Sequence, residues 1–415
     1  MASSQNALGL RGTHPSSDAL VKAQTQRERR GRPRQHAEQS DEPIPPLTLP
    51  LELILDVFKH FDSLQTLATT SRLCSTLQME SERLLYREVS VKRVPHIRSL
   101  HRALVNSPRR SSLVNIFRAI DNGFFDSVLP LLKEILLAFT QLEHLELTLN
   151  LPSQFPEGID TILAQCTFEL KSFASHAFYN KNVLTFLERQ SRLETLRTTG
   201  YPPPDWSIPS DTLPRLKYVE AYSQFFVHAI RAPHAITHLD LSLFYGDPME
   251  FGKILRVVRH QLISLKYNLH FGPHPPVWLL TDNIMNGVSM PNLRYLEIKD
   301  DGMRNPGNLE YTDDNLAHMQ RPNTALDTLV WSARFMSQHN FGPPTPQSRL
   351  AFVRSRAKQL LEIYGVLRRF FYVERIVGDR QHTQETCVVL FKLGSDGRFM
   401  EETTEVNGLP VWSDI

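Results

Sequence analysis

The residue types that most often carry out chemistry are scattered along this chain. Among its 16 histidines, His234 and His238 have the i, i+4 spacing of two metal ligands on one helix, but no further ligand lies nearby in the sequence. The acid pairs Asp300–Asp301 and Asp313–Asp314 fall in predicted turns and helix starts, where acids act as caps. The sequence has no G-x-S-x-G, P-loop, H-E-x-x-H or dinucleotide-binding glycine motif. We therefore predict a non-enzyme with no catalytic residues, no metal site and no cofactor.

The cysteines and the apolar stretches indicate where the protein resides. Cys74, Cys166 and Cys387 are odd in number, far apart and without C-x-x-C spacing, so we expect buried thiols in a reducing compartment. No window reaches the ~18 apolar residues of a membrane span, and the nearest, Leu129–Phe139, is interrupted by charged residues. The N-terminus lacks the apolar segment of a signal peptide. These features predict a soluble protein of the cytoplasm, the nucleus or both, without a membrane partner.

A basic tail precedes the first apolar segment. Residues 1–43 are rich in Ser, Gln, Arg and Pro, and have too few aliphatic residues to form a core, so we predict disorder. The tail contains RGRPR, which resembles an AT-hook, a motif that lays Arg-Gly-Arg into the minor groove of AT-rich DNA. A solvated tail, a nuclear import signal and DNA contact remain open, with DNA contact least favoured, because basic stretches serve all three purposes. The motif consists of Arg30, Gly31, Arg32, Pro33 and Arg34.

The stretch LELILDVFKHF, residues 51–61, is predicted to be a helix with two apolar faces. Seven of its eleven residues are large and apolar, whereas a surface helix normally has one apolar stripe. We expect two further helices, over residues 64–78 and from Glu80 onward, with Asp62 or Ser63 as the first N-cap. Three short helices cover one apolar face but hardly two. The second face is expected to meet either the rest of this chain or a partner with a hydrophobic groove, and both remain open.

The segment LPLELILDVFKHFD…LATTSRLCSTLQ…RLLYREVSV, over residues 47–91, resembles an F-box of the divergent fungal kind. It departs from many F-boxes in having Leu77 near the place of a tryptophan. The resemblance implies three helices whose apolar surface docks on the Skp-type adaptor of an SCF ubiquitin ligase, and through it on cullin. It implies adaptor contacts by Leu49, Pro50, Glu52, Leu53, Leu55, Val57, Phe58, Phe61 and Leu73.

An eight-residue template recurs through the middle of the chain, as LEHLELTL, LKSFASHA, LETLRTTG, LKYVEAYS, ITHLDLSL, LISLKYNL, LRYLEIKD and LDTLVWSA. Positions one and four are apolar in every copy, which predicts one short strand per copy, and the segments between copies have helical spacing. This is the L-x-x-L-x-L pattern of a leucine-rich repeat, so we predict an irregular α/β solenoid. The copies begin at Leu142, Leu170, Leu193, Leu216, Ile236, Leu262, Leu293 and Leu326, with a weaker copy from Leu113.

These patterns divide the chain into four predicted parts. They are a disordered basic tail (1–43), an F-box-like helical domain (44–91), a leucine-rich-repeat solenoid (92–340) and a C-terminal cap (341–415). The cap should contain a helix ending near Gly365 and strands with a turn at residues 395–397. Such a cap shields the open end of a solenoid.

Template positions three, five and seven are expected to face outward from the concave side of the sheet, because side chains alternate along a strand. Four acids and three bases occur there, so the surface is nearly neutral and has no basic stripe for nucleic acid. Any single residue can also be an ordinary exposed strand residue. The predicted target-binding residues are His144, Glu146, Arg197, Tyr218, Glu220, Tyr222, Asp240, Lys266, Tyr295, Glu297 and Lys299.

The resemblance and the repeats together predict a non-catalytic substrate receptor of an SCF ubiquitin ligase, in which the helices bind the adaptor and the repeats bind a protein target. The main alternative is a leucine-rich-repeat scaffold whose N-terminal helices merely cap the solenoid. A third, more distant reading is a nuclear protein tethered to DNA by RGRPR. If the helices are only a cap, then Leu49, Pro50, Leu53 and Val57 should be buried within the chain.

Overall fold

The computed structural model describes residues 50–61, 63–120, 125–149, 158–176, 182–200, 206–230, 234–243, 248–269, 289–300, 325–336, 346–377, 383–394, 396–404 and 409–410. The chain divides into two compact units, residues 1–56 and 57–415. The described part of the first unit is Pro50 and the N-terminal part of helix α1 (Leu51–Lys59). The basic tail with its RGRPR motif, and Leu49, lie outside the described residues.

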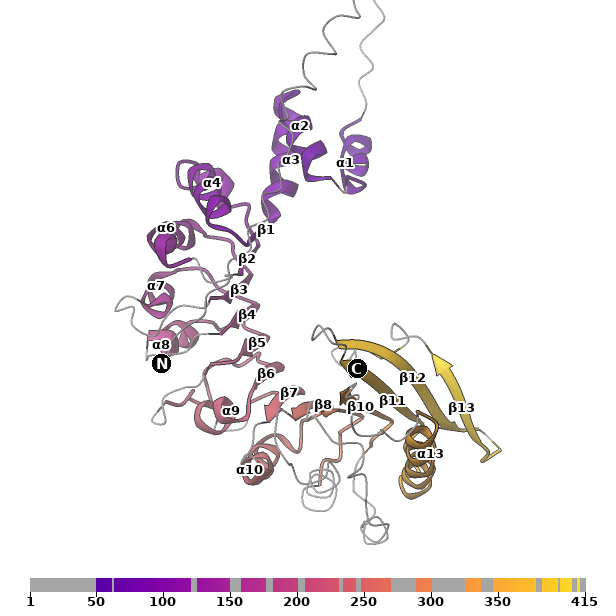
Figure 1. The fold of residues 1–415 in the computed structure, drawn as a ribbon. Coiled ribbons are helices and arrows are strands. Elements are labelled where there is room, and N and C mark those ends of the chain that lie inside the picture. The colour runs from indigo at the N-terminus through magenta and orange to yellow at the C-terminus, as the bar shows by residue number, and fades with distance from the viewer. Residues whose placement is uncertain are drawn as a thin grey trace, which may run out of the picture. The chain divides into compact units, whose positions relative to one another are not determined.

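The second unit contains one open sheet of thirteen described strands, each paired with its predecessor in the chain (Figure 1). Strands β1 to β11 run parallel, and β12 and β13 complete the sheet in antiparallel order. The predicted α/β class is therefore confirmed. The strands are β1 (Glu88–Val91), β2 (Ile116–Ile120), β3 (His144–Thr148), β4 (Ser172–Ser175), β5 (Thr195–Thr198), β6 (Tyr218–Tyr222), β7 (His238–Leu243), β8 (Ser264–Leu269), β9 (Tyr295–Asp300), β10 (Thr328–Met336), β11 (Arg369–Val377), β12 (Thr383–Leu393) and β13 (Phe399–Thr404).

Most of the described helices connect consecutive strands and lie on one side of the parallel part of the sheet (Figure 1). After α1 they are α2 (Leu64–Thr70), α3 (Ser75–Arg87), α4 (Val94–Leu104), α5 (Pro108–Ser111), α6 (Leu129–Ala138), α7 (Ile159–Gln165), α8 (Asn182–Glu188), α9 (Ser223–Ala229), α10 (Pro248–Val258) and α13 (Pro346–Ile363). A 3₁₀ turn, η2 (Phe125–Val128), precedes α6.

The eight template copies form eight consecutive strands, β3 to β10, and pair position by position. Position four of each copy lies beside position four of the next, as in Leu239 beside Leu265 and Leu265 beside Leu296. The residue at position one is buried in every copy, from Leu142 to Leu326. Positions one, four and six therefore form the core that the helices cover, because alternate residues of a strand share one face.

Backbone hydrogen bonds at template position two continue from copy to copy. The amide of Lys171 donates to the carbonyl of Glu143 at 2.7 Å, and the amide of Glu194 donates to Lys171 at 2.9 Å. The same bond recurs through Lys217, Thr237, Ile263, Arg294 and Asp327 to Arg368 at the start of β11. This ladder sets every copy at the same height in the sheet.

The predicted boundaries differ from the structure near the N-terminus. Residues 64–78 do not form one helix, because the turn Ser71–Leu73 separates α2 from α3. The N-cap of α2 is Ser63, which is one of the two residues predicted for this position. Strand β1, placed in the helical domain, pairs with β2 and belongs to the sheet. The expectation of buried thiols holds for Cys166 but is wrong for Cys74, which is exposed just before α3.

The C-terminal elements follow the prediction closely. Helix α13 ends shortly before Gly365, and β11 to β13 extend the sheet rather than cover it as a separate layer. The turn between β12 and β13 is closed by Gly397, whose amide donates to the Gly394 carbonyl at 2.9 Å. Gly397 has φ of 76°, a left-handed conformation that glycine adopts without steric cost.

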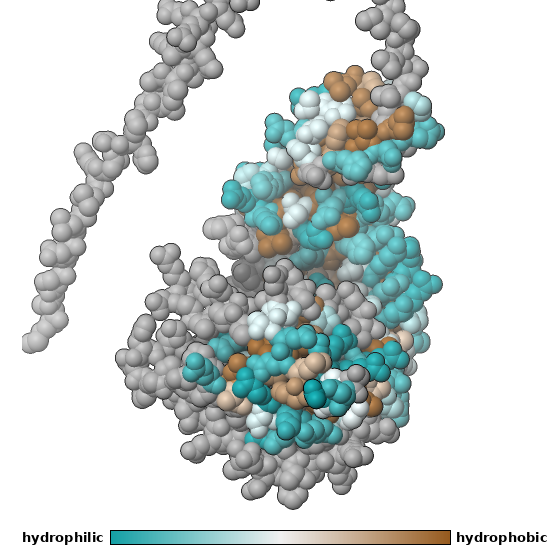
Figure 2. Space-filling model, turned by 90° about the vertical axis from the view of Figure 1, so that its right-hand side faces the viewer, coloured by the Kyte–Doolittle hydropathy of each residue, from teal (hydrophilic) through white to brown (hydrophobic). Residues whose placement is uncertain are grey.

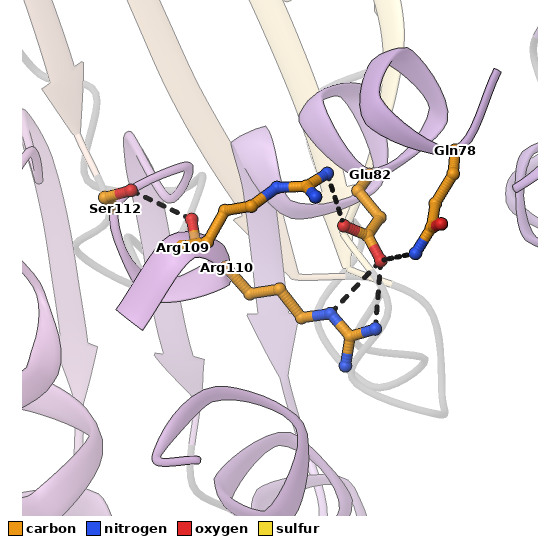
Figure 3. Close-up of polar contacts among 5 residues, drawn as sticks. All are labelled: Gln78, Glu82, Arg109, Arg110 and Ser112. Atoms are coloured by element: carbon orange, nitrogen blue, oxygen red, sulfur yellow. Dashed lines mark hydrogen bonds and ion pairs between the residues drawn. The ribbon is translucent and has the colours of Figure 1, made fainter. Parts of the chain in front are cut away.

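A buried carboxylate joins α3 to α5 (Figure 3). Glu82 is 5% exposed and accepts hydrogen bonds from Arg109 Nη2 and Arg110 Nη2, both at 2.9 Å, and from Gln78 Nε2 at 3.2 Å. Burial alone would raise the pKa of Glu82, but the hydrogen bonds and the arginine charges outweigh it and lower that pKa. Helix α3 runs directly into β1, and α5 lies between β1 and β2 in the chain. The Glu82 contacts therefore fix α3 against the helices at the start of the sheet.

Removing both arginines would leave the Glu82 carboxylate buried and unpaired. We expect the Arg109→Met, Arg110→Met chain to lose about 3 kcal/mol of unfolding free energy, the lower end for a broken buried ion pair, because both arginines are partly exposed. Urea unfolding followed by circular dichroism measures this loss. Adding Glu82→Gln to the same chain removes the buried charge and should restore most of it. An unchanged unfolding free energy in the Arg109→Met, Arg110→Met chain would show that the two arginines do not stabilise the buried Glu82 carboxylate.

Candidate interaction surfaces

The face of the sheet opposite the helices carries the outward positions of the template. In β3 the burial alternates between half-buried and buried residues, and β6 repeats the pattern with Tyr218, Glu220 and Tyr222 outward. The predicted direction of these side chains is therefore confirmed. The predicted start of the weaker copy at Leu113 is wrong by one residue: Arg118 pairs with Glu146 at position five, which makes Val114 position one. We call the charged residues in register with position five the charged row, which consists of Arg118, Glu146, Arg197, Glu220, Asp240, Lys266 and Glu297 on β2, β3 and β5 to β9.

Neighbours of opposite sign pair across the strands of the charged row. Arg118 Nε lies 3.4 Å from Glu146 Oε2, and Arg118 also pairs with Glu88 of β1. Arg197 Nε lies 3.3 Å from Glu220 Oε2. These pairs are partly exposed, and such pairs contribute little to stability, so their main effect is to keep the face nearly neutral.

The centre of the charged row is buried. Lys266 Nζ lies 2.5 Å from Asp240 Oδ2, and Asn268 Nδ2 donates to Asp240 Oδ1 at 2.9 Å. Burial raises the pKa of Asp240 to about 6, even though Lys266 acts to lower it. Burial acts to lower the pKa of Lys266, but the charges of Asp240 and Glu297 outweigh it and raise that pKa. This site is a compact, internally paired charge cluster.

Aromatic residues flank the charged row at position three. The rings of Tyr218 and His238 lie 4.4 Å apart between centroids, and His238 is 5% exposed. The Tyr295 hydroxyl lies 2.9 Å from Glu297 Oε2 and 3.5 Å from the carbonyl oxygen of Pro410. Burial raises the pKa of Tyr295, so its hydroxyl stays protonated as a donor.

The predicted target-binding residues differ in accessibility. Arg197 and Glu220 are exposed, and seven others are half-buried, namely His144, Glu146, Tyr218, Tyr222, Lys266, Glu297 and Lys299. Asp240 and Tyr295 are 2% and 1% exposed, so the expectation that they are accessible is wrong. Lys266 and Asn268 on β8 contact Asp240, whereas Tyr295 contacts Glu297 on its own strand and Pro410 of the C-terminal segment. Asn268 contacts Asp240, and His238 contacts the ring of Tyr218, but both were omitted from the predicted site, although the template alignment places them at outward positions.

Large apolar side chains are exposed on the N-terminal helices. Val57, Leu64, Leu73 and Met79 are 53%, 67%, 69% and 58% exposed, and Leu53 of the first unit is 52% exposed. Figure 2 shows brown apolar surface over these helices. Of the predicted adaptor contacts, Pro50 and Glu52 are also exposed and Phe61 is half-buried. Phe58 is buried at 3%, with its ring 5.1 Å from that of Phe61, so it packs inside the unit. The side chain of Leu55 lies outside the described set.

The described residues contain neither a metal-ligand cluster nor a membrane-spanning helix. No group of three His, Cys, Asp or Glu side chains there could hold a metal ion. His234 and His238 are both buried, and burial lowers the pKa of each imidazole. Within the same part of the chain, no helix is long and apolar enough to cross a membrane.

Comparison with known proteins adds no relative: no family model matches the chain, and no curated protein matches it significantly.

The raised pKa of Asp240 predicts how stability depends on pH. The ordinary pKa of an aspartate is 3.8, and that of Asp240 in the native state is about 6. At pH values between these two, the native state therefore holds the Asp240 proton more tightly than the unfolded state does. The unfolding free energy should therefore fall as pH rises from about 4 to about 6, by up to about 3 kcal/mol from this residue. The Asp240→Asn chain should not show this contribution to the decrease in unfolding free energy. Urea unfolding of both chains at intervals from pH 4 to 7 tests this, and parallel curves would contradict it.

Proposed function

We propose that this chain is a non-catalytic substrate-recognition subunit of an SCF-type ubiquitin ligase. Helices α1 to α3 would form an F-box that docks on a Skp-type adaptor and, through it, on cullin. The sheet and its helices would form an irregular leucine-rich-repeat solenoid, and its outward face would bind a protein target. Holding the target near the charged ubiquitin-conjugating enzyme raises the transfer rate by proximity, without catalytic residues in this chain. The proposal places the protein in the cytoplasm, the nucleus or both.

One observation carries the adaptor part of this proposal. Five of the eight large apolar side chains that are exposed in the described residues lie on α1 to α3 or the turn after α2. Clustered exposed apolar residues mark sites of protein association, because water contact with such surface is unfavourable. The alternative of a plain helical cap predicts that Leu49, Pro50, Leu53 and Val57 are buried within the chain, and the 53% exposure of Val57 in the second unit argues against it.

The outward face of the sheet supports a protein target rather than nucleic acid. Its charged row contains four acids and three bases, and pairs of opposite sign neutralise one another, whereas nucleic-acid surfaces carry a basic stripe. Tyr218 and Tyr222 are half-buried beside the row and offer apolar contact area with a polar tip, a combination that interfaces favour.

Adaptor capture tests the proposal, with a matched pair of substitutions. Val57 on α1 and Val366 after α13 are 53% and 52% exposed, so Val→Asp at either position places a charge on an equally accessible site. We expect wild type and the Val366→Asp chain to capture a purified Skp-type adaptor. Val57→Asp or Leu73→Asp should weaken capture by about 30-fold or more, the size of an interface hot spot, because a charge would be buried in the interface.

Circular dichroism and thermal unfolding establish that each variant is folded. Capture by wild type and its loss in the folded Val57→Asp chain support the receptor function. A folded wild-type chain that does not capture the adaptor contradicts it and favours the scaffold alternative.

A further inference from the structure

The outward face of the sheet changes from charged to apolar beyond β9. In register with the charged row, β10 and β11 carry Val330 and Phe371 in place of charged residues. With Tyr295, Val373 and Val388 they form a second apolar cluster, separate from the core under the helices. We call these five residues the apolar floor. Each is at most 4% exposed, although it lies on the face that the helices do not cover.

The chain's own C-terminal segment contacts the apolar floor. Leu409 packs against it, and the carbonyl oxygen of Pro410 lies 3.5 Å from the Tyr295 hydroxyl. Both residues are half-buried and belong to neither a helix nor a strand. They lie beyond β13, the edge strand of the sheet, and return to β9 across 115 positions of sequence.

The chemistry of this contact fits a short peptide segment with a bend at Leu409. Proline restricts the backbone of the residue before it, so Leu409 has less conformational entropy to lose when it contacts the floor. Proline has no N–H, so it leaves no unsatisfied donor against apolar side chains, while its carbonyl accepts from Tyr295. One aliphatic side chain and one accepted hydrogen bond are a small attachment, which permits local release.

We propose that the apolar floor is a peptide-binding site for a short segment with an aliphatic residue followed by proline, and that Leu409–Pro410 of the same chain occupies it. A partner protein that carries such a segment would displace the chain's own residues and gain access to Tyr295. The tethered segment has a high effective concentration, so the intact chain masks the site and weakens binding of free peptides. This extends the target-binding role proposed for the same face. Its test does not involve the adaptor, so the two proposals can fail separately.

The test uses the full chain and a fluorescein-labelled peptide of residues 405–415, EVNGLPVWSDI. The Leu409→Asp chain should release its own segment and bind this peptide at least about 10-fold more tightly than wild type does, measured by fluorescence anisotropy. A matched peptide with Leu409→Asp should not bind. Combining Leu409→Asp with Tyr295→Phe should weaken binding of the first peptide only modestly, because the one hydroxyl proton is shared between Glu297 at 2.9 Å and the proline carbonyl at 3.5 Å.

A folded Leu409→Asp chain that binds neither peptide would overturn the proposal. Should that chain fail to fold, a second measurement decides. A protease site is inserted between Thr404 and Leu409 in the otherwise wild-type chain, which is then cleaved. Exchange of the cleaved segment for labelled peptide, with the sheet still folded, supports a separable site. Unfolding on release, or no exchange, shows that Leu409 is an integral part of the core and overturns the proposal.

Discussion

The hydrogen-bond ladder at template position two sets the register of the repeated strands, and the core and the outer face both depend on that register. Each amide reaches the carbonyl at the same position of the preceding copy, over 2.7–3.0 Å, from Lys171 to Arg368. With the copies held at one height, positions one, four and six coincide on the inner face and positions three, five and seven on the outer face. Core formation and the cross-strand charge pairs both depend on this registration, because a slip of one residue would exchange the two faces.

Much of this architecture could be predicted because the template has period two and repeats eight times. The apolar positions from Leu142 to Leu326 give the strands, their inward residues and the order of the sheet. The helices between copies and the turn at Gly397 follow from local signals. Strand β1 escaped prediction because its sequence follows α3 without a break, and its identity comes from pairing with β2. The N-terminal helices were less well bounded, because short apolar helices carry little periodic signal.

The accessible part of the candidate surface could not be read from the sequence. Alternation gives the direction of a side chain but not what covers it, and cover comes from residues far apart in the chain. Asp240 is enclosed by Lys266 and Asn268 from the next strand, and Tyr295 by residues near position 410. Phe58 and Leu73 belong to the same short motif, yet one is buried and the other exposed. Tertiary packing distinguishes such residues, and a linear motif does not record it.

The strict order of the sheet also bears on how the protein is made. Every strand pairs with the one synthesised just before it, from β1 to β13. A chain that emerges from the ribosome can therefore add each strand to an existing edge, without waiting for a distant partner. Among the described residues, the contact between Tyr295 and Pro410 joins positions 115 residues apart, so it forms later in synthesis than the pairing of β9 with its neighbours. The outer face of β9 is thus covered by residues made long after the strand itself.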